Sequence, residues 1–219
     1  MVGHIRVADH IVEQLCGAGV RYLFGVDGAN IEDLYDAAHF HAGVTAVLAK
    51  HEFSAAAMAD GYSRAGCGLG VVMATSGGGA LNLIPGLGES LASRVPVLAL
   101  VGQQPTIQDG RGGFQDTSGR NGALDAEALF SAVSLYCRRI TSAEEILTAL
   151  PQAIAAARRG GPAVLLLPKD VQQSRAPLSG HLAAAPAPSI TGDPWPLARA
   201  LRSARGPVTI IAGEQVARD

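Results

Sequence analysis

The chain has 219 residues, of which 48% are hydrophobic and only 16% charged, so a folded core is expected and disorder throughout is excluded. The net charge of −2 comes without a long basic run, which gives no sign of a nucleic-acid-binding surface. Three isolated cysteines predict neither a disulfide framework nor a metal site, and the lack of a signal-like start or a membrane-length apolar run predicts a cytoplasmic protein with no membrane partner.

Hydrophobic periodicity predicts strands and helices in alternation. The expected helices cover residues 7–18, 31–40, 52–64, 80–93, 124–133 and 142–159. The expected strands cover residues 21–26, 44–49, 68–75, 95–102, 134–140 and 161–168. This order predicts an α/β fold: a doubly wound, six-stranded, mostly parallel sheet with helices on both faces.

Local signals refine three places in this pattern. Asn30 is expected to cap the helix that starts at Ile31, and Ser142 with Glu145 is expected to form a capping box. Residues 103–122 form a long, polar, glycine-rich loop, and loops of this length in compact domains are often functional.

Composition changes after residue 171, where the first domain (1–171) is expected to end. Residues 172–194 are rich in proline and alanine and are interpreted as a linker. A helix at 196–204 and a strand at 207–213 follow, and these two elements cannot bury a core by themselves. Residues 195–219 are therefore expected to be the first helix and strand of a truncated second α/β domain.

Four loops that follow strands carry polar side chains, and in an open α/β sheet such loops meet at one edge, where ligands bind. These side chains are Asp27, Glu52, Thr75 with Asn82, and Gln115. Glu52 stands where a strand hands over to a helix. It is either a candidate for proton chemistry or an ordinary first-turn acid favoured by the helix dipole.

Two further features of these loops have competing interpretations. The turn Ser76–Gly79 opens a helix and is either an anion site or a tight turn that needs glycine for close packing. His51 is more readily explained as a hydrogen-bonded structural residue than as a base. The loops contain no nucleophilic set, which indicates that a cofactor performs the difficult chemical step.

Two ordered motifs, residues 51–64 (HEFSAAAMADGYSR) and 70–82 (GVVMATSGGGALN), resemble the pyrimidine-binding domain of thiamine-diphosphate enzymes. The acetolactate synthase-like group is the most similar, and further motifs at 24–28, 101–103, 114–116 and 161–171 follow in the same order. The resemblance covers residues 4–171, and the tail is similar to the first strand of the family's central domain.

The resemblance implies that Glu52 is the catalytic residue, which hydrogen-bonds N1′ of the cofactor's aminopyrimidine and assists removal of the proton from C2 of the thiazolium. It implies that Val26, Asp27, Gly28, Thr75, Gly78 and Asn82 bind the cofactor. Phe114, Gln115 and Lys169 are implied on the substrate side.

Two departures from the family pattern concern the substrate. In many synthases proline stands at the positions of Asp27 and of Gly78. A carboxylate at position 27 would repel an anionic 2-oxo acid unless it is turned away or protonated, so a substrate other than pyruvate is considered.

The resemblance also places the diphosphate and Mg²⁺ on a different domain, which carries a GDG…NN motif that this sequence lacks; no metal ligand is therefore assigned here. A diphosphate-binding domain, in the same or another chain, and assembly as a homodimer or homotetramer are implied. Some relatives bind FAD through the central domain, so FAD is a further cofactor to consider.

The implied function is decarboxylation of a 2-oxo acid and transfer of the resulting acyl-carbanion equivalent to an acceptor. Three alternatives are a non-catalytic or regulatory module that keeps this fold, one subunit of a split 2-oxo acid decarboxylase, and a nucleotide-binding domain that uses Ser76–Gly79.

Overall fold

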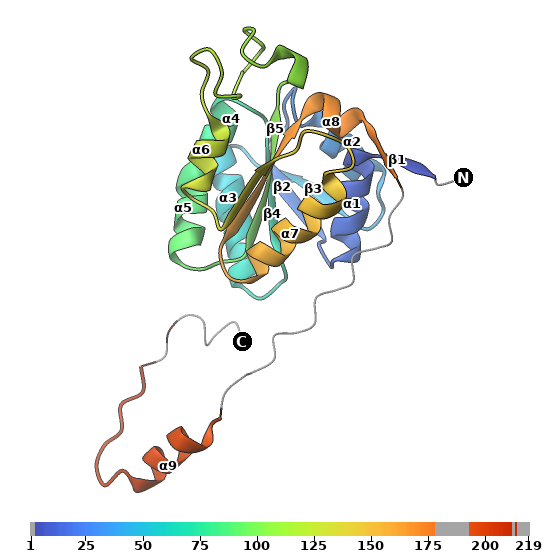
Figure 1. Ribbon diagram of the computed structural model, residues 1–219. Helices are drawn as coiled ribbons and strands as arrows, with labels where there is room; N and C mark the ends of the chain where they lie inside the picture. The colour runs from blue at the N-terminus through green and yellow to red at the C-terminus, as the bar shows by residue number, and fades with distance from the viewer. Residues whose placement is uncertain (1–2, 178–192, 212, 214–219) are drawn as a thin grey trace. The chain divides into compact units, whose positions relative to one another are not determined.

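The computed structural model describes residues 3–177, 193–211 and 213, and its centre is a six-stranded parallel sheet (Figure 1). The strand order is β3-β2-β4-β5-β7-β6. The strands are β2 (Tyr22–Gly25), β3 (Thr45–Leu48), β4 (Gly70–Ala74), β5 (Val97–Gln103), β6 (Tyr136–Arg139) and β7 (Pro162–Pro168). Strand β3 lies on one side of β2 and strand β4 on the other, so the direction in which successive strands are placed reverses next to β2. In open α/β sheets ligands bind at such a point.

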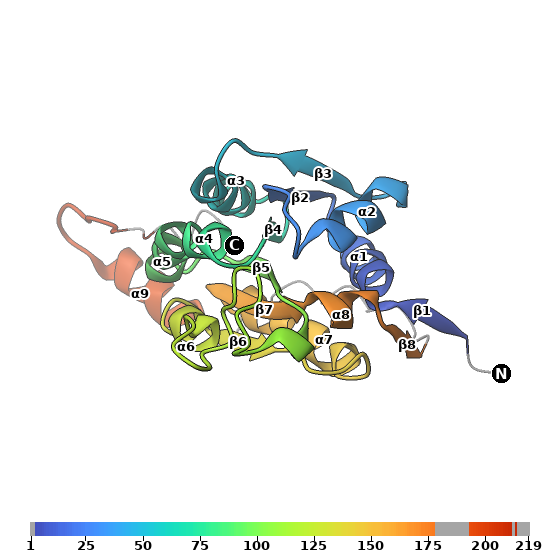
Figure 2. The ribbon, with the colours of Figure 1, turned by 90° about the horizontal axis from the view of Figure 1, so that it is seen from above.

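Helices cover both faces of the sheet, as predicted (Figure 2). One face carries α1 (Val7–Gly17), α2 (Glu32–Phe40), α7 (Ile146–Arg158) and the short α8 (Lys169–Gln173). The other carries α3 (Glu52–Arg64), α4 (Gly78–Leu81), α5 (Ile84–Ala92) and α6 (Ala126–Ser131). Each face has its own apolar core, and β5 and β7 are buried along their whole length, as befits central parallel strands.

The prediction of a single helix over residues 80–93 is wrong, because two helices, α4 and α5, stand in its place. Pro85 explains the break. It has no N–H to donate within a continuous helix, and its ring would clash with the carbonyl of Leu81, where α4 ends. The first turn of a new helix tolerates proline, so α5 starts at Ile84.

Two predicted caps also need correction. Asn30 does not cap α2: its side chain donates to Ser76 Oγ at 2.7 Å, and Ile31 occupies the cap position without a side-chain bond. The capping box before α7 is half formed, since Ser142 Oγ accepts from Glu145 N at 3.4 Å. The carboxylate of Glu145 instead accepts from the backbone N–H of Thr141 at 2.8 Å, one residue earlier than the box requires.

The first unit continues beyond the boundary predicted at residue 171. Residues 172–177, which were expected in the linker, complete α8 and form β8 (Arg175–Pro177). Strand β8 pairs antiparallel with β1 (His4–Arg6), an element that periodicity does not reveal because it has only three residues. The rest of the predicted linker, up to residue 192, lies outside the described residues.

The second unit contains α9 (Trp195–Ser203), close to the helix predicted at 196–204. The strand predicted at 207–213 is not formed in the described part of this segment. Ile210 and Ile211 are 75% and 94% exposed, and no neighbouring strand accepts or donates their backbone hydrogen bonds among the residues described. Within the same described ranges, no helix is both long and apolar enough to cross a bilayer.

Candidate functional site

The loops after β2, β4 and β5 meet at the carboxyl edge of the sheet, as the sequence predicts. Asn30 donates its backbone N–H to Thr75 Oγ1 at 3.2 Å and its side-chain amide to Ser76 Oγ. Ser76 Oγ in turn donates to Gln115 Oε1 at 3.3 Å. Sequence reasoning assigned Asn30 only a capping role, but its side chain joins the loop after β2 to the turn after β4, which Ser76 links to the loop after β5.

Glu52 is the first residue of α3 and is half-buried at this edge. Asn82 Nδ2 donates to Glu52 Oε2 at 2.9 Å, so two residues that were predicted separately form one pair. Oε1 receives no hydrogen bond from any residue that the structure describes. His51 caps α3, since its Nδ1 accepts from Phe53 N at 3.1 Å, and this agrees with the structural role expected for it.

Glycines allow the loops to approach one another closely. A Cβ on Gly79 would lie 2.9 Å from Glu52 Oε1 and 2.9 Å from Thr75 Cγ2, closer than real Cβ atoms approach. A Cβ on Gly28 would lie 2.7 Å from that of Thr75. At Gly78 the position is open, with no heavy atom within 4 Å. The site is therefore tightly packed around the Glu52 carboxylate on one side and open at Gly78.

The remaining two residues predicted to bind cofactor follow β2. Val26 is half-buried and packs against the core on the α3 face of the sheet. Asp27 is exposed, and its Oδ1 accepts from the backbone N–H of Gly28 at 2.8 Å. This bond turns the carboxylate back onto its own loop.

Tyr35 of α2 is a residue that sequence reasoning missed. Its hydroxyl oxygen is buried and has no hydrogen-bond partner among the described residues. Burial raises the pKa of the Tyr35 phenol, and the nearby negative charges of Asp27 and Glu52 raise it further. In sequence Tyr35 lies four positions after Ile31 with no motif to mark it, so only the three-dimensional structure reveals its position near the site.

The predicted substrate-side residues separate into two groups. Phe114 and Gln115 lie in the loop after β5; Phe114 is 68% exposed, and Gln115 contacts the turn after β4. Lys169, at the start of α8, bonds to the Ala29 carbonyl at 2.6 Å and forms an ion pair with Glu32. Its ammonium therefore braces the N-terminus of α2.

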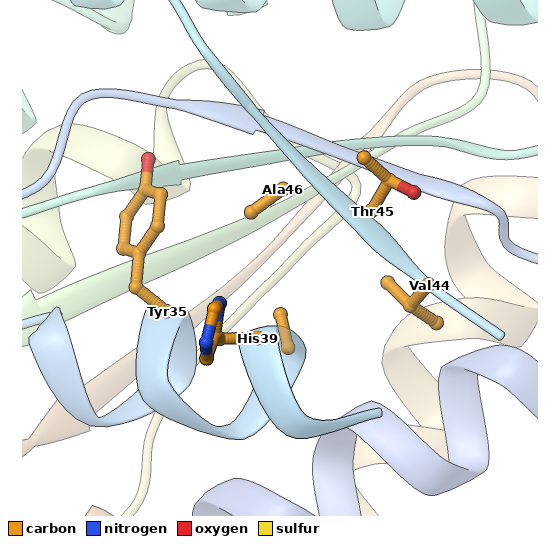
Figure 3. Close-up of a pocket in the computed structure, with 6 residues that line it drawn as sticks. Tyr35, His39, Val44, Thr45 and Ala46 are labelled. Carbon is orange, nitrogen blue, oxygen red and sulfur yellow. The ribbon is translucent and has the colours of Figure 1, made fainter. Parts of the chain in front are cut away.

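A separate hollow of about 450 Å³ lies between α2 and the edge strand β3 (Figure 3). Tyr35, Ala38, His39, Val44, Thr45 and Ala46 line it. None of the residues predicted for the site is among them, and Tyr35 is the lining residue that also lies near Asp27 and Glu52.

Comparisons with known proteins give a consistent result. Residues 5–123, more than half of the chain, match the sequence model of the family described as "Thiamine pyrophosphate enzyme, N-terminal TPP binding domain". The chain is 37% identical over 170 residues to the probable acetolactate synthase large subunit of Methanocaldococcus jannaschii, which covers 77% of this chain and 27% of that protein. It is 36% identical over 166 residues to the acetolactate synthase isozyme 3 large subunit of Escherichia coli, covering 75% and 28% respectively.

The match to a further relative extends to the tail. The chain is 32% identical over 217 residues to the probable acetolactate synthase large subunit of Methanococcus aeolicus, which covers 94% of this chain and 35% of that protein. The chain spans only about a quarter to a third of the length of these relatives.

Proposed function

Because the chain belongs to the thiamine pyrophosphate enzyme family and carries its N-terminal TPP binding domain, we propose that Glu52 is the proton partner of a bound thiamine diphosphate. One observation carries this proposal. Asn82 fixes one carboxylate oxygen of Glu52, and the other has no donor among the described residues. A fixed carboxylate with a free oxygen at the topological switch point suits a weakly basic ring nitrogen.

The residues around Glu52 fit the pyrimidine end of this cofactor. Gly78 leaves room for a flat ring beside the turn after β4, and Val26 supplies an apolar surface at the end of β2. Thr75, Gly28 and Asn82 complete the surroundings, while Asp27 is held against its own backbone. These are the residues that we assign to cofactor binding.

Thiamine diphosphate supplies, when bound, the carbon nucleophile and the electron sink that amino-acid side chains lack. Glu52 would carry a proton at Oε1 and share it with the ring nitrogen through a hydrogen bond. Asn82 would keep the Glu52 carboxylate in place. General acid–base assistance of this kind is worth about 10²–10⁴-fold in rate.

We further propose that the complete protein decarboxylates a 2-oxo acid and transfers the acyl unit to an acceptor, as an acetolactate synthase-like carboligase. The names of the relatives support this assignment. Phe114 and Gln115 would approach the substrate. Lys169 is assigned to the substrate side only if its ion pair with Glu32 opens.

The proposal requires a second domain that holds the diphosphate and Mg²⁺, in the same polypeptide or in a partner. Residues 195–219 are proposed to begin the central domain, since the similarity to the Methanococcus aeolicus protein covers 94% of the chain. That central domain is where FAD would bind if the protein uses it. Assembly as a homodimer or homotetramer would bring the two halves of the site together, and light scattering on the complete protein tests this.

Three other assignments compete with this one: a non-catalytic module, one subunit of a split decarboxylase, and a nucleotide-binding domain that uses Ser76–Gly79. Replacing Glu52 with Gln in the complete protein separates catalysis from binding. We expect Glu52→Gln to lower kcat by about 10²–10⁴-fold, because an amide acts neither as an acid nor as a base near neutral pH. Affinity for thiamine diphosphate with Mg²⁺, measured by calorimetric titration, should change by less than about tenfold, since Asn82 still has an acceptor.

Glu89→Gln on α5, where the side chain is 67% exposed, is the matched control and should leave both quantities unchanged. Unchanged turnover in Glu52→Gln would favour the non-catalytic module. Turnover that appears only when a second polypeptide is added would favour the split enzyme.

A further inference from the structure

A largely buried polar cluster connects the loop after β5 to strands β5 and β6, outside the residues assigned above. We call it the loop clamp, and its members are Gln103, Gln104, Asp109, Asp116 and Arg139. Gln103 and Gln104, at the end of β5, are fully buried. Gln104 Nε2 donates to Asp109 Oδ1 at 2.9 Å and to Asp116 Oδ1 at 2.8 Å, so one amide joins two separate points of the loop.

Arg139, the last residue of β6, supplies the positive charge of the loop clamp. Its Nη2 lies 2.9 Å from the carboxylate of Asp109, and its Nε donates to Gln103 Oε1. The side chains of Arg139 and Asp109 are only 15% and 5% exposed. Removing one member of a buried ion pair leaves the other charge uncompensated, so this pair strongly favours one loop conformation.

Asp116 ties the middle of the loop to the same cluster. Its Oδ2 accepts from Gly110 N at 2.8 Å and its Oδ1 from Ser118 N at 2.9 Å. Burial by itself raises the pKa of Asp116, but the hydrogen bonds from Ser118 and Gly110 and the charge of Arg139 outweigh it and lower the pKa below its usual value. The carboxylate form of Asp116 is therefore the one that holds the loop.

Gln115 directly precedes Asp116 and has a left-handed backbone, with φ of 56°. Residues other than glycine adopt this region only when their surroundings hold them there. Its side chain packs against Gly77, where a Cβ would lie 2.8 Å from the Cβ of Gln115, and its Oε1 accepts from Ser76. The strained residue is thus held by the loop clamp on one side and by the turn after β4 on the other.

We propose that Arg139 is a positioning residue, which acts through Asp109, Gln104 and Asp116 to fix Gln115 at the edge of the site. The expected effect of Arg139 on catalysis rests on the proposed function, which assigns Gln115 to the substrate side. These contacts begin at Arg139 on the edge strand β6 and lead towards the site. Arg139 itself contacts none of the residues assigned to the cofactor.

The test compares Arg139→Gln with Arg138→Gln in the complete protein. Arg138 is the preceding residue of β6, but its side chain is 57% exposed and pairs with Glu145, so it is a matched control. Exposed Arg111 and Arg120 give trypsin two cleavage points within the loop. We expect Arg139→Gln to raise cleavage there at least tenfold and to speed hydrogen exchange of the Gly110 and Ser118 amides, while Arg138→Gln matches wild type.

Turnover then tests whether the role is positioning. Straight-chain 2-oxo acids are the probes, and the one that the wild-type protein uses best is chosen. Arg139→Gln should lower kcat/KM at least tenfold relative to wild type. In a protein that already carries Gln115→Ala, adding Arg139→Gln should lower kcat/KM less than threefold, because the side chain that Arg139 positions is no longer there. Arg139→Lys keeps the positive charge but lacks the planar group whose Nε and Nη2 reach Gln103 and Asp109, so it should recover part of the loss.

Asp109→Asn is the second variant, for use if Arg139→Gln does not fold, and it should speed exchange at the same two amides. Unchanged cleavage and exchange in Arg139→Gln, or equal losses of kcat/KM with and without Gln115, would overturn the proposal. The cleavage and exchange measurements need no turnover. A wild-type protein that uses no 2-oxo acid, with those two measurements responding as expected, would therefore count against the proposed function and not against the loop clamp.

Discussion

The loops after β4 and β5 both reach the candidate site, but they are held there in different ways. The turn after β4 is short, and its position depends on missing side chains, since a Cβ on Gly77 or Gly79 would overlap Gln115 or Glu52. The loop after β5 is long and depends on buried polar groups, with Asp109, Asp116 and Arg139 at their centre. The turn after β4 should therefore be displaced when a methyl group is added, and the loop after β5 when a charge is removed.

Gly79→Ala should give the largest effect on the turn after β4. The added methyl group would lie 2.9 Å from Glu52 Oε1, so either α4 or the carboxylate must shift. We expect a loss of about 100-fold in kcat/KM, because displacements near 1 Å at a reacting group cost that much, and about 1–3 kcal/mol of stability from overpacking. Steady-state kinetics and thermal unfolding measure the two effects.

The control for Gly79→Ala is Gly61→Ala on α3, an exposed position with no heavy atom within 4 Å of the added Cβ. It should raise the free energy of unfolding by about 0.5–1 kcal/mol, as alanine does in an open helix interior. Equal behaviour of the two alanine variants would mean that close packing at Gly79 is unimportant.

Gly78→Ala tests whether the cofactor occupies the open space at the turn after β4. The methyl group meets no protein atom within 4 Å, so the unfolding temperature should be kept. Affinity for thiamine diphosphate with Mg²⁺ should fall about tenfold, or about 1.4 kcal/mol, because the methyl group enters the proposed pocket. Titration calorimetry measures this, and an unchanged affinity would place Gly78 outside the pocket.

The loop after β5 should respond to acid through Asp116, the smallest of these effects. Its folded pKa lies below the ordinary value of 3.8, so its contribution is fully present above pH 3.8 and is lost as the pH falls through the lower folded value. Hydrogen exchange at Gly110 and Ser118, corrected for the intrinsic pH dependence, should be steady from pH 6 to pH 4.5 and accelerate below pH 3.8.

Asp116→Asn serves as the control for this pH dependence, because an amide does not titrate. Its exchange should be faster than in wild type at pH 6 and should show no additional step in acid. A step of the same size in both proteins would assign the acid response to another group.

The sequence predicts the layers of this fold well because its strands and helices are periodic and local. Strand β3 and helix α3 form as expected, and Glu52 begins the helix at the predicted residue. The topology of parallel sheets then places the loops at one edge without further information. Thus the general location of the candidate site, though not its hydrogen bonds, follows from the order of the elements.

The parts that could not be predicted are pairings between distant residues. Lys169 meets Glu32 across 137 positions, and Arg139 meets Asp109 across 30, with no periodic signal to mark either pair. Asn30 has a strong capping signal, but a tertiary bond to Ser76 overrides it. Side chains such as these acquire their roles only when the sheet brings their loops together.

The pairing of β1 with β8 has a practical consequence for work on this domain. His4 lies beside Pro177, so the first and last described strands of this unit are neighbours. Domains with adjacent ends tolerate insertion into other proteins and circular permutation better than most. A shortened version that stops at residue 171 would leave the backbone of residues 4–6 without its partner strand, whereas one that ends after Pro177 keeps both ends joined.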